Sequence, residues 1–173
     1  MAFITTGDFA MPSLAICAAR FADRHNVGVF GEDVFANTYH NQKEKPVKTF
    51  VTYSDATDGG GTKGGVERTL AHGNTWYVDK LLITATGKDS AEANAIMRKH
   101  INFLCSVRGE PVHCEEDGIW YYILHVAMIG RVGRSGRNAD GLEQYNAALR
   151  VLWRPMSNKD PGYYELTGFS TDD

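Results

Sequence analysis

The hydrophobic period of this chain changes abruptly between two neighbouring segments, and that change constrains the fold more than any other feature. Residues 74–86 alternate with a period of two and are apolar on both sides, which predicts a strand that is central in a sheet or covered twice. Residues 90–108 instead repeat every three or four positions, which predicts an amphipathic helix. Asp89 and Glu92 form an Asp version of a capping box at its start, and Gly109 is expected to stop it.

Weaker patterns predict the rest of the secondary structure. Helical spacing predicts a first helix over residues 11–26, and alternation predicts strands over 47–54, 119–129 and 143–154. The connections between successive strands are too short for helical crossovers, so the strands are expected to pair mainly antiparallel. The sequence therefore predicts an α+β fold, a mainly antiparallel sheet with two principal helices packed on one face.

The length of 173 residues fits one domain, which we expect to span residues 1–155 and to be followed by a C-terminal extension, 156–173. The extension contains one lysine and four acidic residues, together with the aromatic residues Tyr163, Tyr164 and Phe169. Because large apolar side chains are costly to expose, the extension is expected to lie on its own sheet or on a neighbouring subunit.

Composition narrows the classes of function. The net charge of −3 gives no general attraction to nucleic acid or to an anionic membrane. No apolar run is long enough to cross a bilayer and the N-terminal residues lack a signal-peptide pattern, so we expect a cytoplasmic protein without a membrane partner.

The chain has three cysteines, Cys17, Cys105 and Cys114. Because their number is odd and their spacing does not repeat, they do not predict a disulfide framework. Cys17 and Cys105 are expected to be buried thiols on apolar helix faces.

The glycine-rich stretch 58–65 contains Lys63 and invites comparison with a phosphate-binding loop. A Walker A loop needs Gly-Lys followed by Ser or Thr at the start of a helix, and here Gly64 follows Lys63. We therefore expect a mobile projecting loop in which Lys63 is available to a partner.

No group of residues forms a convincing catalytic or metal site. His100, Cys105, His113 and Cys114 lack the paired spacing of a structural zinc site, and His100 is expected to be a hydrogen-bonded core histidine. The acidic residues 115–117 are expected to form a solvated turn. The sequence therefore predicts neither cofactor nor metal, and no enzymatic activity.

Arg131, Arg134 and Arg137 form the most distinctive charged feature of the chain. They are expected either to contact phosphate or an acidic partner surface, or to be the solvated tip of a hairpin. Together with Lys63 and the aromatic residues of the extension, they are the candidate interface, DNA or partner contacts.

Four segments in this order resemble the tail terminator and tail-completion (minor capsid) proteins of tailed bacteriophages: residues 13–21, 47–53 with the loop after them, 81–94 and 136–153. The resemblance implies a structural subunit without catalytic residues. It implies a ring, typically hexameric, that caps the tail tube and joins it to the head connector or stopper protein. It also implies a location in the tail or neck of the virion after assembly in the host cytoplasm, with transient contact with passing DNA.

Two alternatives stay open. The first is a head-completion or connector subunit of the same neck. The second, from another class of function, is a small cytoplasmic enzyme or ligand-binding domain whose pocket residues are dispersed in the sequence.

Overall fold

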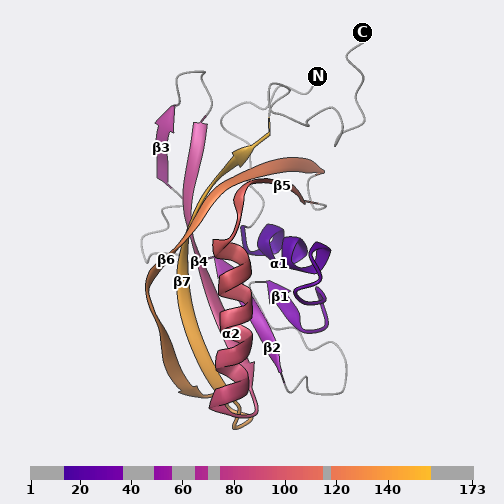
Figure 1. Cartoon of the computed structure of the whole chain (residues 1–173), viewed down its shortest axis with the longest axis vertical. Coiled ribbons are helices and arrows are strands. Elements are labelled where there is room, and N and C mark those ends of the chain that lie inside the picture. Colours follow the sequence, from indigo (N-terminus) through magenta and orange to yellow (C-terminus); the bar gives the residue numbers. More distant parts are fainter. Residues whose placement is uncertain (1–13, 37–48, 56–64, 70–74, 115–117, 157–173) are drawn as a thin grey trace.

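The computed structural model describes residues 14–36, 49–55, 65–69, 75–114 and 118–156 (Figure 1). These ranges form a seven-stranded sheet and two helices, which confirms the α+β class predicted from the sequence. In chain order the elements are α1 (Leu14–Arg24), β1 (Val34–Ala36), β2 (Phe50–Asp55), β3 (Gly65–Thr69), β4 (Thr75–Gly87), α2 (Ser90–Cys105), β5 (Arg108–Cys114), β6 (Ile119–Arg137) and β7 (Glu143–Pro155).

The strands lie in the order β1-β2-β4-β7-β6-β5, and β3 pairs with the first part of β4. All the pairs are antiparallel except β1 with β2, which is parallel. The expectation of a mainly antiparallel sheet is therefore confirmed. As predicted, β4 is a central strand, since β2 and β7 flank it.

Helix α2 begins where the capping pattern predicts. The side chain of Asp89 accepts a hydrogen bond of 2.8 Å from the backbone N–H of Glu92. Glu92 returns a bond, but it accepts from the N–H of Lys88 at 2.8 Å, one residue before the cap. Gly87 allows the chain to pass this closely to the first turn of α2, because a Cβ at this position would lie 2.7 Å from the backbone nitrogen of Ala93.

The predicted end of this helix was wrong. Helix α2 ends at Cys105, and Ser106 caps it by donating to carbonyl oxygens of the last turn through both its backbone N–H and its hydroxyl. Gly109, expected to stop the helix, instead lies inside β5 with a φ of +66°. The sequence does not predict β5, because Gly109 and the proline two residues later, Pro111, are typical of the end of a helix.

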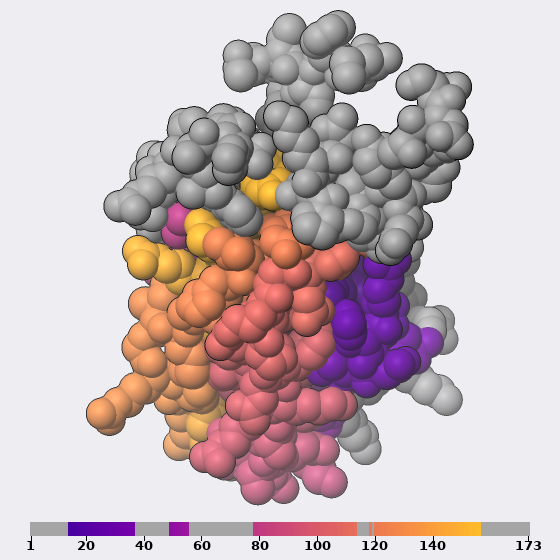
Figure 2. Space-filling model, turned by 45° about the horizontal axis from the view of Figure 1, so that its top comes forward, coloured from indigo at the N-terminus to yellow at the C-terminus, as the bar shows by residue number. Residues whose placement is uncertain are grey.

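Both helices pack on one face of the sheet, and their apolar sides share one core with it. Figure 2 shows α1, α2 and β6 lying beside one another across the molecule. Met97 and Leu104 are buried and Ile96 is half-buried against the core, which confirms the predicted apolar stripe of α2. Cys17 is buried as expected, whereas Cys105 is only half-buried.

Strand β6 departs most from the sequence prediction. It was expected to end at residue 129 and to be followed by a connection, but it continues to Arg137. The glycines that suggested a loop are accommodated as irregularities in the pairing of β6 with β7. The short strand β1 was also missed, since three residues carry too little periodicity to be recognised.

Candidate functional site

The far half of the β6–β7 hairpin, residues 126–150, is called the arm below. Strand β5 pairs with β6 only as far as His125. From Val126 to Arg137, no strand in the described part of the chain pairs with the outer side of β6. The arm therefore presents a free strand edge, which is a common site of pairing with another chain.

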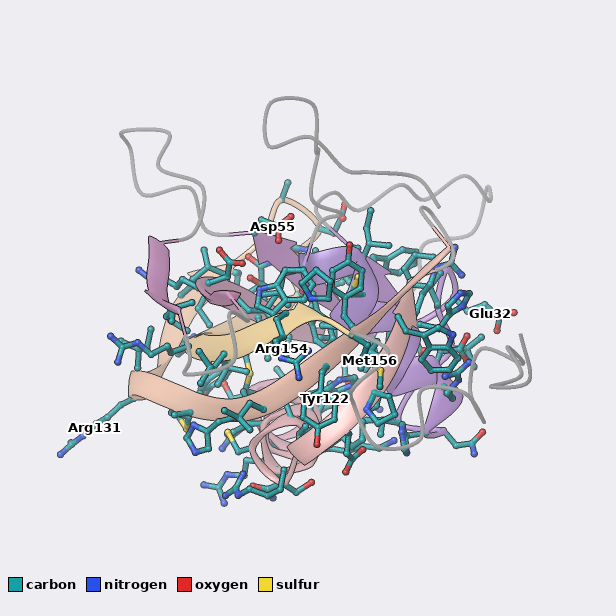
Figure 3. The ribbon with its side chains drawn as sticks, turned by 90° about the horizontal axis from the view of Figure 1, so that it is seen from above. Glu32, Asp55, Tyr122, Arg131, Arg154 and Met156 are labelled. Atoms are coloured by element: carbon teal, nitrogen blue, oxygen red, sulfur yellow. The ribbon has the colours of Figure 1, made fainter. Side chains whose placement is uncertain are left out.

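A wide bulge lies in the middle of this edge. Ile129 pairs with Ala148 and Gly133 with Asn146, so three residues of β6 oppose a single residue of β7. Gly130 has a φ of +74°, a conformation that favours glycine. The bulge carries Arg131 on its outer side, and Figure 3 shows this side chain extending away from the ribbon.

The three predicted arginines divide into a pair and a single residue. Arg134 donates two hydrogen bonds to the carboxylate of Glu143, at 2.9 and 2.8 Å, and Arg137 donates another at 2.8 Å. These bonds lower the pKa of Glu143 to about 2 and raise the pKa of Arg134. Glu143 is only 3% exposed, so the cluster holds the two strands of the arm together next to its terminal turn. Sequence reasoning missed Glu143, which it recognised only as the first residue of a strand.

Arg131 stands apart from this cluster. It is exposed, and within the described residues no acidic side chain forms an ion pair with it. Its neighbours Met128 and Ile129 are 39% and 43% exposed, which is high for large apolar side chains. Of the three arginines, Arg131 is therefore the one that is positioned to meet a partner.

The end of the arm is a compact turn. The side-chain oxygen of Asn138 accepts hydrogen bonds from the backbone N–H groups of Asp140 and Leu142, at 3.0 and 2.9 Å. The N–H of Asn138 donates to the carbonyl of Leu142 at 2.9 Å. These bonds give the arm a defined end.

The face of the sheet away from the helices is the second candidate surface. Leu82, Ala148 and Ile129 are register partners across β4, β7 and β6, and they form an apolar row on this face. Leu82 is 37% exposed, and no helix in the described ranges covers it. Of the two predicted alternatives for β4, central or covered twice, the structure has the central one. Lys80 and Arg150 form the next row.

The other predicted contact residues lie outside the described residues. These are Lys63 with most of its glycine-rich loop, and Tyr163, Tyr164 and Phe169 of the C-terminal extension. The acidic turn at 115–117 also lies outside the described ranges. Their roles stay predictions.

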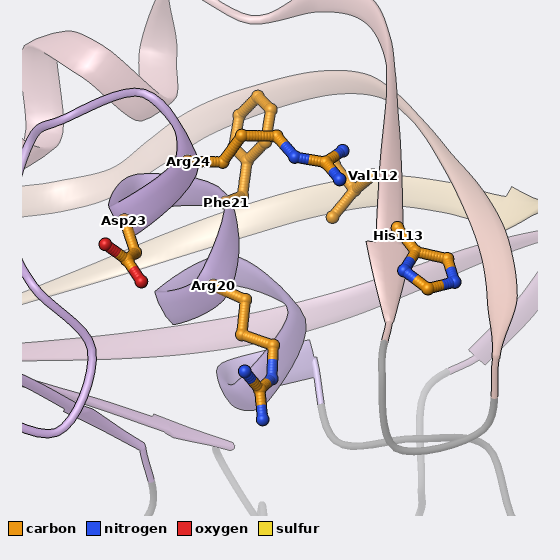
Figure 4. A pocket seen from close by; sticks show the side chains of 6 residues that line it. All are labelled: Arg20, Phe21, Asp23, Arg24, Val112 and His113. Atoms are coloured by element: carbon orange, nitrogen blue, oxygen red, sulfur yellow. The ribbon is translucent and has the colours of Figure 1, made fainter. Parts of the chain in front are cut away.

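A hollow of about 260 Å³ lies between α1 and β5 (Figure 4). Its lining residues come from both elements and are mostly charged or aromatic: Arg20, Phe21, Asp23, Arg24, Val112 and His113. The guanidinium of Arg24 lies over the ring of Trp120, 5.2 Å from its centroid, and His113 packs on the same ring. Such a lining suits a small anion more than an apolar ligand.

A buried tyrosine–histidine pair lies outside the arm. Tyr53 of β2 is hydrogen-bonded to Nδ1 of His100 on α2, which confirms His100 as a hydrogen-bonded core residue. Burial raises the pKa of Tyr53 and lowers that of His100 to about 4.

Among the described residues there is no group of three or more His, Cys, Asp or Glu side chains that could hold a metal ion. The described helices include none that is long and apolar enough to span a membrane.

The resemblance of this chain to known proteins is structural and weak. No protein-family model matches the chain, and no curated protein matches it. Among solved structures, it aligns with a chain from the virion of a native gene transfer agent particle. The TM-score is 0.48 with 10% identity, over 82% of this chain and 94% of that chain.

Proposed function

We propose that this chain is a structural subunit of a phage-type tail or neck. In this proposal it forms a ring, hexameric as in the tail terminator proteins that its sequence resembles. The ring caps the tail tube and joins it to the head connector. The chain then acts by binding other proteins and carries out no reaction of its own.

The observation that carries the proposal is the one-sided construction of the sheet. Both helices lie on one face, and the other face presents the apolar row of Leu82, Ala148 and Ile129 beside the charged row of Lys80 and Arg150. Exposed apolar rows with a polar border are typical of surfaces that bind other proteins. The free edge of the arm adds a second surface of this kind.

In the proposed ring, each subunit uses two different contact surfaces. A closed ring needs a heterologous interface, in which one surface of a subunit meets a different surface of its neighbour. The C-terminal extension, 156–173, is proposed as a further contact within the chain or between subunits. A head-completion or connector subunit of the same neck would use the same kind of surfaces.

Contact with passing DNA is proposed for the same assembly, with Lys63 as one contact. Such binding would come from phosphate contacts and would weaken steeply with salt. Fluorescence anisotropy with duplex DNA at rising salt concentration measures this directly. Binding that does not depend on salt would contradict the proposed phosphate contacts.

Immunogold electron microscopy of tailed particles tests the proposed location. The gene is expressed with an epitope tag in cells that produce the particles, and the label is expected at the junction of head and tail. Label on the head surface, on the distal tail tip, or absent from intact particles would contradict the proposal.

A ligand-binding domain is the second candidate, and the basic hollow between α1 and β5 is the observation that favours it. If it is correct, isothermal titration with inorganic phosphate gives a saturable signal that Arg24→Ala removes. The structural proposal predicts no saturable binding of free phosphate.

A further inference from the structure

The two ends of the sheet carry surfaces of matching apolar character and opposite charge. The arm patch consists of Met128, Ile129 and Arg131 on the free edge of β6. The turn patch consists of Val29, Glu32 and Asp33, in the turn that leads from α1 into β1. Strand β1 is the edge strand at one end of the sheet, and β6 lies next to the last strand at the other end.

Each patch combines an exposed apolar group with an exposed charge. Val29 is 46% exposed, and Glu32 and Asp33 are both exposed. On the arm, Met128 and Ile129 are exposed beside the guanidinium of Arg131. Because both patches expose apolar atoms and carry opposite charges, they are complementary in character.

The patches also face away from each other. Seen along the view of Figure 3, Glu32 and Arg131 lie at opposite sides of the molecule. One subunit therefore cannot join its own patches, whereas the arm of one copy can reach the turn of the next. This head-to-tail arrangement is the heterologous contact that a ring requires.

The geometry of the arm favours contact along its edge. Met128 and Ile129 are consecutive in β6, so their side chains point to opposite faces of the strand. A partner seated against the edge would contact both, whereas a partner on either face would contact only one. The bulge directs Arg131 outward at the same place.

The turn patch is held in a defined shape. The carbonyl of Val29 accepts hydrogen bonds from the N–H groups of Glu32, Asp33 and Val34, each at 3.1 Å. The carboxylate of Asp33 accepts a further bond from the N–H of Val29. Because the turn is already ordered in one subunit, docking onto it would cost little conformational entropy.

We infer that the arm patch of one subunit docks on the turn patch of a second copy of this chain, with Arg131 facing Glu32. The inference rests on the proposed ring, for which it names the contact. Asp33 contributes charge, and its bond to Val29 keeps the turn in shape. The contact is expected to weaken with salt, because exposed opposite charges are screened.

Charge reversal tests the inference. Arg131→Glu and Glu32→Arg are each expected to weaken association about tenfold or more, as measured by light scattering over a range of concentrations. An equimolar mixture of the two variants, or the double variant, is expected to regain association, because opposite charges face each other again. Arg98→Glu, which reverses the charge of an exposed arginine on α2 that belongs to neither patch, is the matched control and is expected to change nothing. Thermal melting checks that all the variants remain folded.

The outcomes separate this inference from the proposal on which it rests. If the wild-type chain assembles and the single reversals behave like Arg98→Glu, the named contact is wrong and the ring proposal stands. Weakened single variants that are not rescued by mixing would also overturn the pairing of Arg131 with Glu32. If the wild-type chain remains a monomer at every concentration, the ring proposal fails and the inference fails with it.

Discussion

The centre of the sheet and the arm are parts of the same strands, yet they use their side chains differently. Around α2, apolar groups are buried, and the buried side chains of Tyr53 and His100 form a hydrogen bond with each other. On the arm, two arginines donate hydrogen bonds to the carboxylate of Glu143. Met128, Ile129 and Arg131, in contrast, are exposed at the surface. The comparison indicates that the centre stabilises the subunit, whereas the outer edge of the arm is available for another chain.

Truncation of Leu104 should have the largest effect on stability. Leu104 is 2% exposed in the core, so Leu104→Ala is expected to lower the free energy of unfolding by about 2–5 kcal/mol. Urea unfolding measures the loss. Asn102→Ala, at an exposed position on the same helix, is the matched control and should cost less than about 0.5 kcal/mol. A similarly small loss at Leu104 would contradict the assignment of α2 to the centre.

The buried histidine should give stability a dependence on pH. Burial, the largest cause, lowers the pKa of His100 from 6.5 to about 4, so the unfolded chain binds more protons at intermediate pH. The stabilising contribution is therefore complete above the unfolded pKa and is lost as the pH falls from 6.5 toward 4. Between about pH 7 and pH 5, the unfolding free energy should fall by about 2 kcal/mol on this account.

Urea unfolding of the wild-type chain and of His100→Gln at both pH values isolates this contribution from that of the other histidines. The variant is expected to lose less stability than the wild-type chain over the same pH interval. Equal losses of unfolding free energy in the two proteins would show that His100 does not contribute to the pH dependence of stability.

Glu143→Gln should loosen the arm and leave the centre unchanged. The substitution removes the charge that Arg134 and Arg137 share, so amides 130–137 should lose protection from hydrogen exchange while those of α2 keep theirs. Because its hydrogen bonds lower the pKa of Glu143 to about 2, the same loss is expected in the wild-type chain as the pH falls from 4.5 toward 2. Asp140→Asn, an exposed change on the same arm, is the matched control. Equal effects of the two substitutions would contradict the role of Glu143.

Arg131→Ala should have the smallest effect on the isolated subunit. Its exposed side chain forms no ion pair within the described residues, so the free energy of unfolding should change by less than about 0.5 kcal/mol. The same substitution should weaken association, which would separate the two regions by function. A large loss of stability would place Arg131 with Arg134 and Arg137 as a residue that supports the fold.

The sequence predicts the centre well because burial produces strong periodicity. The alternation of residues 74–86 and the cap at Asp89 are local signals, and the structure has both elements where they were expected. The order and direction of the strands follow from the short connections between them.

The sequence does not reveal the arm, because its decisive features depend on pairing with β7. Gly130, Gly133 and Gly136 suggest a loop when read alone, but in the structure they lie in or beside bulges in the pairing of β6 with β7. Glu143 is recognisable as an anchor only once β7 brings it beside Arg134 and Arg137. The outward position of Arg131 likewise depends on the bulge, so no spacing rule distinguishes it from its neighbours.

Native mass spectrometry of the purified wild-type chain tests the central claim most directly. A closed ring predicts one dominant assembly whose mass is a whole multiple of the 19.1 kDa chain, and a hexamer is the assembly that we propose. Arg131→Glu should shift the population toward the monomer at the same concentration. A spectrum that contains only the monomer at every accessible concentration, or an open series of oligomers without a preferred closed species, would contradict the account.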